Sequence, residues 1–461
     1  MKLTVIGGGG VRAPLFVASA LRRATALGLD EICLMDTDGP KLALTGALAQ
    51  GVARKAGSPV RVTTTTDARQ ALDGASFVVT TIRVGGDEGR VLDERIALRH
   101  GVLGQETTGP GGFAMALRSI PAILGYARLR DELCPDAWMF NFTNPAGLVA
   151  QALHDAGYAR AVGICDSANG AQEAIAPRLG CAASDLRPEV FGLNHLSWTR
   201  RVMYQGEDVL PRLLADPDVL RETRLNIFEP ALVRHLGMWL NEYLYYFYYA
   251  EQAVAAISAE ERTRGEEVLM LNRDLLAQLR QLDPARDLDA ALAVYYRYER
   301  RRSSTYMHYA QQDAPTPEEA DALFNATFLQ ADPHEGEGYA GVALGIMAAL
   351  TSGEPHYTAL NVPNNGAIAG MAPDDVVEVS CVVDGDGVHP LPIGAIPDGP
   401  ALLMQVIKRY ERLTVRAVAE RSRALAVDAL MAHPLVLSYS RAHVLVDEYL
   451  AAHAPYVGEW A

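Results

Sequence analysis

Length, composition and charge narrow the class of protein before any motif is considered. The chain has 461 residues, 49% of them hydrophobic and 21% charged, so it can form two or three domains with buried cores. Its 41 Lys and Arg residues against 56 Asp and Glu residues give a net charge of −15. Nucleic acids and anionic membranes attract clustered cations, so we expect neither as a partner.

Other features favour a cytoplasmic protein. The five cysteines are an odd number and form no CxxC pair, which is typical of a reducing compartment. The apolar residues 339–352 are interrupted by glycines and fall short of the ~20 residues of a membrane span, so we predict a buried helix. Met1 leads directly into a predicted strand, without the apolar core of a signal peptide.

The first 165 residues alternate apolar runs with helical patterns. Strands are predicted at residues 3–6, 31–35, 60–64, 77–81, 138–142 and 161–165, and helices at 13–27, 40–55, 117–133 and 146–156. This alternation predicts an α/β fold with a parallel, Rossmann-type sheet and right-handed crossovers. Ligands bind such sheets at the carboxyl ends of the strands.

The remaining residues are less regular and predict a mixed α+β domain. Residues 218–302, 400–433 and 437–453 have helical patterns, 376–383 resemble a strand, and the Pro- and Gly-rich residues 384–400 indicate a surface loop. We therefore expect one domain at residues 1–165 and a second at 166–461 that closes a cleft against the first.

Consecutive glycines follow the first strand and open the first helix. Glycines at such a turn let the backbone approach a pyrophosphate, which binds at the helix N-terminus. An acid at the end of the second strand can bind the adenosine ribose and favours NAD over NADP. The alternative is a structural glycine turn. The predicted NAD-binding residues of this region are Gly7, Gly8, Gly9, Gly10, Val11, Arg12 and Asp36.

Polar residues also gather where other strands end. Such clusters occur at residues 83–90, 104–112, 141–145 and 163–167. Several strands that deliver polar groups to one edge of a sheet are what an active site needs, although each cluster alone could be a loop or a helix cap.

Cys165 and His195 each follow an apolar run. A thiolate and an imidazole can share a divalent cation and leave positions open for substrate oxygens. The alternative is a buried structural cysteine and an unrelated histidine. The aromatic residues 243–249 also stand out, and most of them suit packing between domains. Tyr243, at the edge of the run, is the exception with a possible chemical role.

These motifs resemble those of glycoside hydrolase family 4, and the resemblance covers nearly the whole chain. The glycines at 7–10, Arg83-Val84-Gly85-Gly86, Gly104-Gln105-Glu106-Thr107, Thr143-Asn144-Pro145-Ala146-Gly147, Gly163-Ile164-Cys165-Asp166 and Gly192-Leu193-Asn194-His195 occur in the family's order. Val362-Pro363-Asn364-Asn365-Gly366, Val376-Val377-Glu378-Val379 and His433-Pro434-Leu435-Val436 resemble its second domain.

The resemblance implies a glycosidase with a fold akin to malate and lactate dehydrogenases that uses NAD and Mn²⁺. It implies hydride removal from sugar C3, loss of the C2 proton, departure of the C1 substituent, addition of water and return of the hydride. The implied roles are metal ligation by Cys165 and His195, proton donation by Asp166, base catalysis by Tyr243 with a hydrogen bond to Glu106, sugar binding by Arg90, Asn144 and Arg264, and cofactor contact by Arg83.

The motifs leave the substrate open. Asp166 resembles the α-specific branch of the family, whereas residues 105–108 and the aromatic run resemble the β-specific branch, and we favour 6-phospho-β-glucosides. An α-linked or non-phosphorylated glycoside is the alternative. Other readings are an NAD-dependent 2-hydroxy acid dehydrogenase on the same fold and a non-catalytic NAD-binding protein. The resemblance also implies a homodimer or homotetramer.

Overall fold

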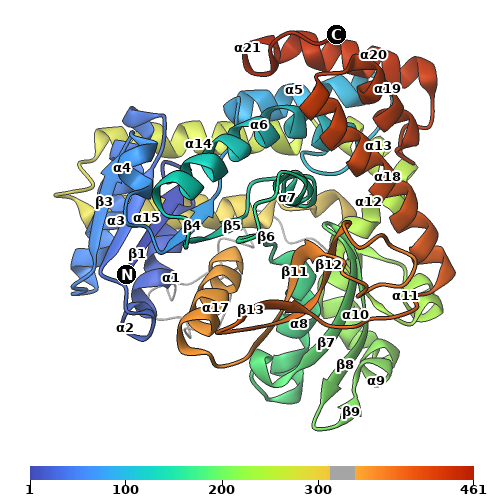
Figure 1. Ribbon diagram of the computed structural model, residues 1–461, viewed down its shortest axis with the longest axis horizontal. Helices are drawn as coiled ribbons and strands as arrows, with labels where there is room; N and C mark the ends of the chain where they lie inside the picture. The colour runs from blue at the N-terminus through green and yellow to red at the C-terminus, as the bar shows by residue number, and fades with distance from the viewer. Residues whose placement is uncertain (312–337) are drawn as a thin grey trace.

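A nine-stranded sheet forms the centre of the molecule. The computed structural model describes residues 1–311 and 338–461. Within them the strands follow the order β13-β12-β11-β6-β5-β4-β1-β2-β3, with helices on either side of the sheet (Figure 1). The predicted α/β class is confirmed.

Six parallel strands make up one part of the sheet, and each agrees with its predicted range to within two residues at either end. They are β1 (Lys2–Ile6), β2 (Glu31–Met35), β3 (Arg61–Thr65), β4 (Phe77–Thr80), β5 (Trp138–Asn141) and β6 (Ala161–Gly163). β1 lies between β2 and β4, where Leu3 is opposite both Ile32 and Phe77. Helices cover both faces, so most residues of β1, β2, β4 and β5 are buried.

Helices connect these strands. They are α1 (Ala13–Arg22), α2 (Ala24–Leu27), α3 (Gly39–Lys55), α4 (Ala68–Leu72), α5 (Gly86–Arg99), α6 (Pro110–Leu133) and α7 (Ala146–Asp155). The sequence did not predict α5. Its buried side chains include the charged Arg90, Asp93 and Glu94, so the helix lacks a clear apolar period.

Three later strands extend the same sheet. β11 (His356–Pro363), β12 (Val376–Asp384) and β13 (Gly387–Pro390) run antiparallel, and β11 joins β6 where Asn361 is opposite Gly163. The prediction of a loop over residues 384–400 is therefore wrong for β13, a four-residue strand that follows a tight turn. The sheet continues across residue 165, and the division into domains there stays a prediction.

A second, antiparallel sheet lies below the first in Figure 1. It consists of β7 (Arg187–Leu193), β8 (Leu196–Tyr204), β9 (Glu207–Asp208) and β10 (Trp239–Leu240). The helices of this part are α8 (Gly170–Leu179), α9 (Leu210–Ala215), α10 (Pro217–Glu222), α11 (Pro230–Leu236), α12 (Tyr245–Tyr248), α13 (Ala250–Ala259), α14 (Arg264–Gln281) and α15 (Leu288–Ser304). Residues 218–302 are thus mainly helical, as predicted, but β10 interrupts them.

Helices also form the last part of the chain. They are α17 (Gly338–Ser352), α18 (Asp398–Glu420), α19 (Arg423–Ala432), α20 (Tyr439–Ala452) and α21 (Ala454–Val457). The single helix predicted over residues 400–433 is two helices, because Arg421 has a φ of +49°. A left-handed residue at this position ends an α-helix.

The aromatic run packs inside the chain. Tyr243, Tyr245 and Tyr246 are buried, and Trp198 Nε1 donates a hydrogen bond to Tyr248 Oη at 3.2 Å. The structure therefore uses these side chains for packing within one chain, and the homo-oligomer stays a prediction.

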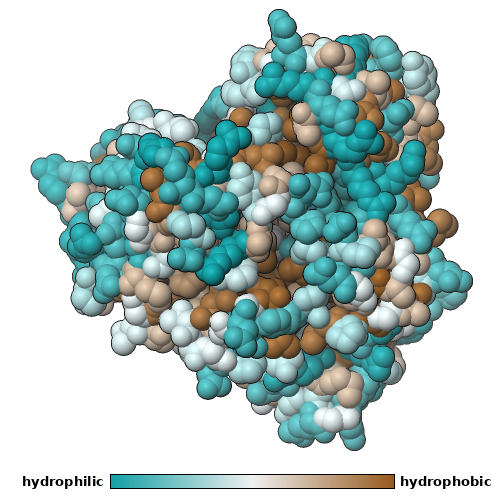
Figure 2. Space-filling view, viewed as in Figure 1, coloured by the Kyte–Doolittle hydropathy of each residue, from teal (hydrophilic) through white to brown (hydrophobic). Residues whose placement is uncertain are grey.

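The surface is mostly hydrophilic on the face shown in Figure 2, where hydrophobic residues collect toward the middle of the view. All five cysteines are free thiols. Among the described helices, none has both the length and the hydropathy that crossing a membrane requires.

A buried cluster of charges ties the C-terminal helices to the sheet. Arg118 on α6 donates two hydrogen bonds to the Asp93 carboxylate, at 2.9 and 2.7 Å, and a third to the Val84 carbonyl at 3.0 Å. His453 Nε2, at the end of α20, lies 2.6 Å from Asp93 Oδ1. The cluster therefore also fixes the segment after β4, which carries Arg83.

We expect Arg118→Met to lower the free energy of unfolding by about 3–5 kcal/mol, because it leaves the Asp93 charge buried and less compensated. The control is Arg99→Met, which removes the partly exposed pair with Glu448 on α20 and should cost less than about 1 kcal/mol. Chemical unfolding of both variants checks this, and equal losses would contradict it.

Glu378 is a second buried charge, in the middle of β12. Its side chain is 0% exposed, and Oε1 accepts hydrogen bonds from Asn194 Nδ2 and Asn361 Nδ2, both at 3.1 Å. Burial raises the pKa of Glu378 from its ordinary 4.5 to about 7. The folded protein therefore keeps this proton at pH values where the unfolded chain has released it.

We expect Glu378→Gln, which cannot ionise, to lose less stability than the wild type between pH 5 and pH 8. Between pH 4.5 and about 7, Glu378 keeps its proton in the folded protein and has released it in the unfolded chain. The stabilisation from protonated Glu378 is thus complete below pH 4.5 and is lost as the pH rises through about 7. The difference between the variants should be of the order of 2–3 kcal/mol. Unfolding curves at both pH values test this, and parallel pH dependences would refute it.

Candidate active site

One large cavity lies at the carboxyl ends of the parallel strands. Its volume is about 1300 Å³, and its wall includes residues that follow β1, β2, β4, β5 and β6. The structure brings fourteen of the sixteen predicted site residues to this wall: Gly7, Gly10, Val11, Arg12, Asp36, Arg83, Arg90, Glu106, Asn144, Cys165, Asp166, His195, Tyr243 and Arg264.

The other two, Gly8 and Gly9, lie behind the wall at positions that admit no side chain. A Cβ atom on Gly8 would be 2.7 Å from Leu34 Cβ, and one on Gly9 would be 2.8 Å from the Asp36 carboxyl carbon. Gly9 N donates to Asp36 Oδ2 at 2.9 Å. The carboxylate at the end of β2 is thereby held beside the glycine loop.

The start of α1 suits an anion. The helix begins at Ala13, and its first turn carries no acidic side chain. The positive end of the helix dipole therefore lies next to the cavity, with no carboxylate in the helix's own first turn. With Asp36 beside the loop, this arrangement fits a dinucleotide, with the pyrophosphate at the helix and the ribose at the acid.

Cys165 and His195 meet at another part of the cavity wall. Both are buried, and Cys165 Sγ lies 3.4 Å from His195 Nε2. One cation bonded to both would give a similar separation, since metal–sulfur and metal–nitrogen bonds are about 2.3 and 2.1 Å long. Among the described residues, no set of three or more His, Cys, Asp and Glu side chains is grouped closely enough to hold a metal ion.

Burial controls the protonation of this pair. It lowers the pKa of His195 to about 4, so the imidazole is neutral and able to coordinate at neutral pH. Burial, with the charges of Asp166 and Glu378, raises the pKa of the Cys165 thiol well above its usual value. A thiolate at this position therefore needs a positive charge next to it.

A tight turn presents His195 to the cavity. Asn194 and His195 connect β7 to β8, and His195 has a φ of +62°, which is uncommon for a residue with a side chain. Asn194 is held by its hydrogen bond to Glu378. The His195 ring stacks on Tyr243, with centroids 3.7 Å apart and planes within 3°.

Tyr243 lies between His195 and another phenol. Its hydroxyl is hydrogen-bonded to Tyr306, and burial together with the charge of Glu106 raises the pKa of Tyr243 well above its ordinary value. The expected hydrogen bond from Tyr243 to Glu106 is not found among the described residues. The Glu106 carboxylate instead binds Arg83 Nη1 at 2.7 Å and Arg90 Nη1 at 3.1 Å. Two guanidinium groups outcompete a neutral phenol for a buried carboxylate.

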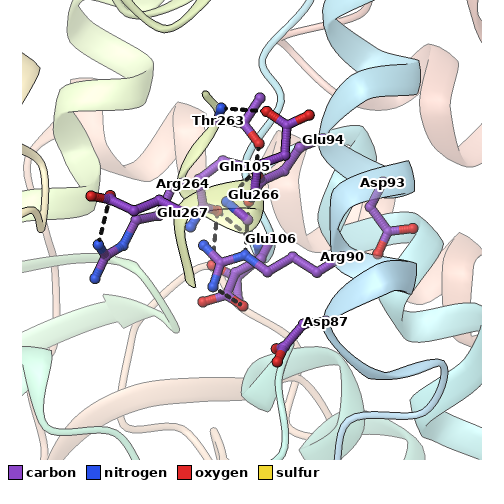
Figure 3. A network of polar contacts seen from close by, with 12 residues as sticks. Asp87, Arg90, Asp93, Glu94, Gln105, Glu106, Thr263, Arg264, Glu266 and Glu267 are labelled. Carbon is purple, nitrogen blue, oxygen red and sulfur yellow. Dashed lines mark hydrogen bonds and ion pairs between the residues drawn. The ribbon is translucent and has the colours of Figure 1, made fainter. Parts of the chain in front are cut away.

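The arginines and carboxylates of the cavity form a continuous network (Figure 3). Although burial opposes it, Arg83 and Arg90 hold the pKa of Glu106 well below its usual range. Arg90 extends from α5 toward Glu106 in Figure 3, whereas Asp93 on the same helix points away. Glu106 therefore stays ionised and fixes the end of the Arg90 side chain.

Glu94 holds the other side of Arg90. It is 1% exposed, and its two oxygens accept hydrogen bonds from Arg90 Nε at 2.8 Å and Gly265 N at 2.7 Å. A Cβ atom on Gly265 would be 2.7 Å from Glu94 Oε2, so a larger residue there would displace the Glu94 carboxylate. The first turn of α14 is thus fixed against α5, which places Arg264 on the cavity wall.

Several arginines gather on one side of the cavity, and Arg83, Arg90 and Arg264 each have a carboxylate partner. Burial, followed by the charges of Arg90 and Arg302, lowers the pKa of Arg264. Arg264 Nη2 donates to the Arg302 carbonyl at 2.6 Å, and Nη1 donates to Glu267 Oε2 at 3.1 Å. Guanidinium groups gathered in this way suit a phosphate or a carboxylate.

Acids surround Asp166 on the other wall. Burial raises the pKa values of Glu173 and Glu242 to about 7, and the charge of Asp166 contributes to both shifts. Asp166 itself lies next to Cys165 in the sequence and reaches the cavity. A carboxyl group in this position can exchange a proton with a ligand held between the two walls.

Sequence reasoning assigned no site role to several residues that the structure places in or next to the cavity. They are Glu94, Gln105, Thr107, Arg302 and Tyr306. Glu94 follows Arg90 by one helical turn, which is a usable signal for an ion pair. The others depend on long-range contacts that neither spacing nor periodicity encodes.

Comparison with known proteins agrees with this geometry. The model described as "Family 4 glycosyl hydrolase" matches residues 2–181, and "Family 4 glycosyl hydrolase C-terminal domain" matches residues 190–436. The two matches together span both sheets and the cavity between their strands.

Individual relatives cover the full length of the chain. A "Probable 6-phospho-beta-glucosidase" of Bacillus subtilis strain 168 is 31% identical, with 100% of this chain and 98% of the relative covered. A "6-phospho-alpha-glucosidase 1" of Lacticaseibacillus paracasei is 28% identical, with 99% and 98% covered.

A solved structure is also similar throughout. It is the 6-phospho-beta glucosidase of Thermotoga maritima with manganese, NAD⁺ and glucose-6-phosphate, at a TM-score of 0.82 and 26% identity, with 100% of both chains covered. The chain described here belongs to family 4 of the glycosyl hydrolases.

Proposed function

We propose that this protein hydrolyses 6-phospho-β-glucosides by an elimination that needs NAD and a divalent cation, Mn²⁺ in the first instance. The observation that carries the proposal is one cavity that contains a glycine loop with an acid, a Cys–His pair, a stacked tyrosine and an arginine cluster. The family relationship and the glucose-6-phosphate, NAD⁺ and manganese bound by the Thermotoga maritima relative support it.

The residues present fit both cofactors. Gly7–Gly10, Val11, Arg12 and Asp36 would hold the nucleotide, with Arg83 nearby, and Cys165 and His195 would hold the cation. When bound, NAD⁺ would supply a hydride acceptor for sugar C3, and the cation would supply a Lewis acid at the oxygens of C2 and C3.

Tyr243 and Asp166 suit the two proton transfers. Tyr243 is stacked against His195, so a sugar bound at a cation on Cys165 and His195 would lie within its reach, and its phenolate would take the C2 proton. Asp166, on the same wall as Cys165, gives a proton to the oxygen of the leaving group. The two groups come from different chain segments, which lets one act on C2 and the other at C1.

The arginine wall suits the phosphate. Arg90 and Arg264 are fixed through Glu94, and Arg302 lies next to them. Asn144, which follows β5, lines the same cavity and suits a sugar hydroxyl. Charged hydrogen bonds to a phosphate are strong, so a phosphorylated glycoside should be preferred over a plain one.

The choice of a β-linkage rests on the sequence features of residues 105–108 and of the aromatic run. The B. subtilis relative at 31% identity carries a β-glucosidase name, and the L. paracasei relative at 28% carries an α-glucosidase name. An α-linked substrate is therefore the second candidate, favoured by Asp166. Both named relatives are glucosidases by name, which weighs against the alternative of a 2-hydroxy acid dehydrogenase.

A panel of nitrophenyl α- and β-glucosides, plain and 6-phosphorylated, tests the function with NAD⁺, Mn²⁺ and a thiol reductant present. We expect the 6-phospho-β-glucoside to be cleaved with a kcat/KM about 100-fold or more above that of the plain β-glucoside. The plain compound has no phosphate for the arginines to bind. No net NADH should form. Preferential cleavage of the α-compound would overturn the linkage, and stoichiometric NADH would overturn hydrolysis.

Tyr243→Phe removes one hydroxyl and keeps the ring that stacks on His195. We expect kcat to fall by about 10²- to 10⁴-fold while Mn²⁺ binding stays near the wild-type value, since the change removes only the base. The matched control is Tyr248→Phe, whose hydroxyl contacts Trp198 outside the cavity. Steady-state kinetics and a Mn²⁺ titration check this, and a near-normal rate would assign the base elsewhere.

A further inference from the structure

The loop before α6 contacts His195 from the side opposite Cys165. Thr107 Oγ1 lies 2.9 Å from His195 Nδ1, while Cys165 Sγ lies 3.4 Å from Nε2. The two ring nitrogens of His195 therefore face different partners. In a neutral imidazole only one of them carries a proton, and the other has the lone pair that a cation needs.

The orientation of the Gln105 amide is set by the backbone. Thr107 N and Thr108 N both donate to Gln105 Oε1, at 2.7 and 2.6 Å. Backbone N–H groups need an acceptor, and the amide NH₂ group has no lone pair to offer. The atom that faces the loop is therefore the oxygen.

The Thr107 hydroxyl then has one possible direction. Its Oγ1 lies 3.0 Å from Gln105 Oε1. Two oxygens at this distance repel each other unless a hydrogen lies between them, and Oε1 has none. The Thr107 proton must point at Gln105, so Oγ1 offers only a lone pair to His195 Nδ1, which must carry the proton.

The surrounding backbone leaves this loop little freedom. A Cβ atom on Gly111 would be 2.0 Å from the Gln105 carbonyl oxygen, and one on Gly112 would be 2.1 Å from that of Thr107. The loop thus lies directly on the first turn of α6. Gln105 is 9% exposed and His195 5% exposed, so both partners of Thr107 are buried, while Thr107 itself is partly exposed.

We propose that Gln105 and Thr107 are positioning residues that fix His195 as its Nδ1–H tautomer and so turn the Nε2 lone pair toward Cys165. The consequence for metal binding rests on the proposed function, whereas the tautomer does not. Partners that orient a metal-binding histidine through its other nitrogen raise the affinity for the ion.

The tautomer can be measured in the metal-free wild-type protein. Ring-¹⁵N-labelled histidine and long-range ¹H–¹⁵N spectra distinguish a protonated nitrogen from an unprotonated one, and the spectrum of His195→Gln identifies the His195 signals among the 11 histidines. We expect a protonated Nδ1 and an unprotonated Nε2 at neutral pH. A protonated Nε2 would overturn the proposal, whatever the Thr107 variants show.

A Mn²⁺ titration followed by electron paramagnetic resonance tests the consequence. We expect Thr107→Val to weaken Mn²⁺ binding about 10-fold or more and Thr107→Ser to restore it, since only the hydroxyl matters. The matched control is Thr108→Val, which removes a buried hydroxyl from the same loop and should leave the affinity unchanged.

The outcomes separate the two proposals. Equal affinity in Thr107→Val and the wild type, or equal losses in the two valine variants, would overturn the positioning role. If the wild-type protein shows the expected tautomer but binds no Mn²⁺, the positioning role of Gln105 and Thr107 is supported. The metal site of the proposed function is then overturned.

Discussion

The site depends on the contact between Cys165 and His195. The two side chains are distant in the sequence and come from the end of β6 and from the turn between β7 and β8. Three restraints converge on this contact: the positive φ of His195, the anchoring of Asn194 by Glu378, and the loop that carries Thr107. Each restraint belongs to a different part of the chain, so the pair forms only when both sheets have assembled.

The same principle applies to the arginine wall. Arg90 is held between Glu94 and Glu106, and Glu94 also binds the first turn of α14. A buried charge is stable only with such partners, and rigid partners fix its direction. Burying these charges would then serve the proposed function, because it would fix Arg90 and Arg264 in place before an anionic ligand binds.

The sequence predicts the parallel half of the fold well because its signals are local. An apolar run, a glycine turn and a helix follow one another within about thirty residues, as in any βαβ unit. The strands β11 to β13 join the same sheet from far along the chain, and their pairing leaves no local trace. α5 escaped prediction because its buried residues Arg90, Asp93 and Glu94 are charged, and charge usually indicates exposure.

The site shows the same limit. Residues next to strand ends, such as Asp36 and Cys165, could be named from position and from the family motifs. The partner of Glu106 could not be predicted from the sequence. Arg83, Arg90 and Tyr243 were all available, and the choice depends on side-chain geometry. Gln105 and Thr107 lie in a loop whose motif was recognised, but their contact with His195 needs the tertiary fold.

The two walls of the cavity differ in electrostatics, and this difference bears on how the site would work. Glu106 and Asp87, beside Arg83, have lowered pKa values, whereas Glu242 and Glu378, on the side of Cys165, have pKa values raised to about 7. A divalent cation between Cys165 and His195 would lie on the second wall, where it would lower the pKa of the thiol and of Tyr243 together. One charge would thus create its own ligand and activate the base beside it. A phosphate held by the arginines would fix the other end of the sugar, so binding and chemistry would fall to different residues of one cavity.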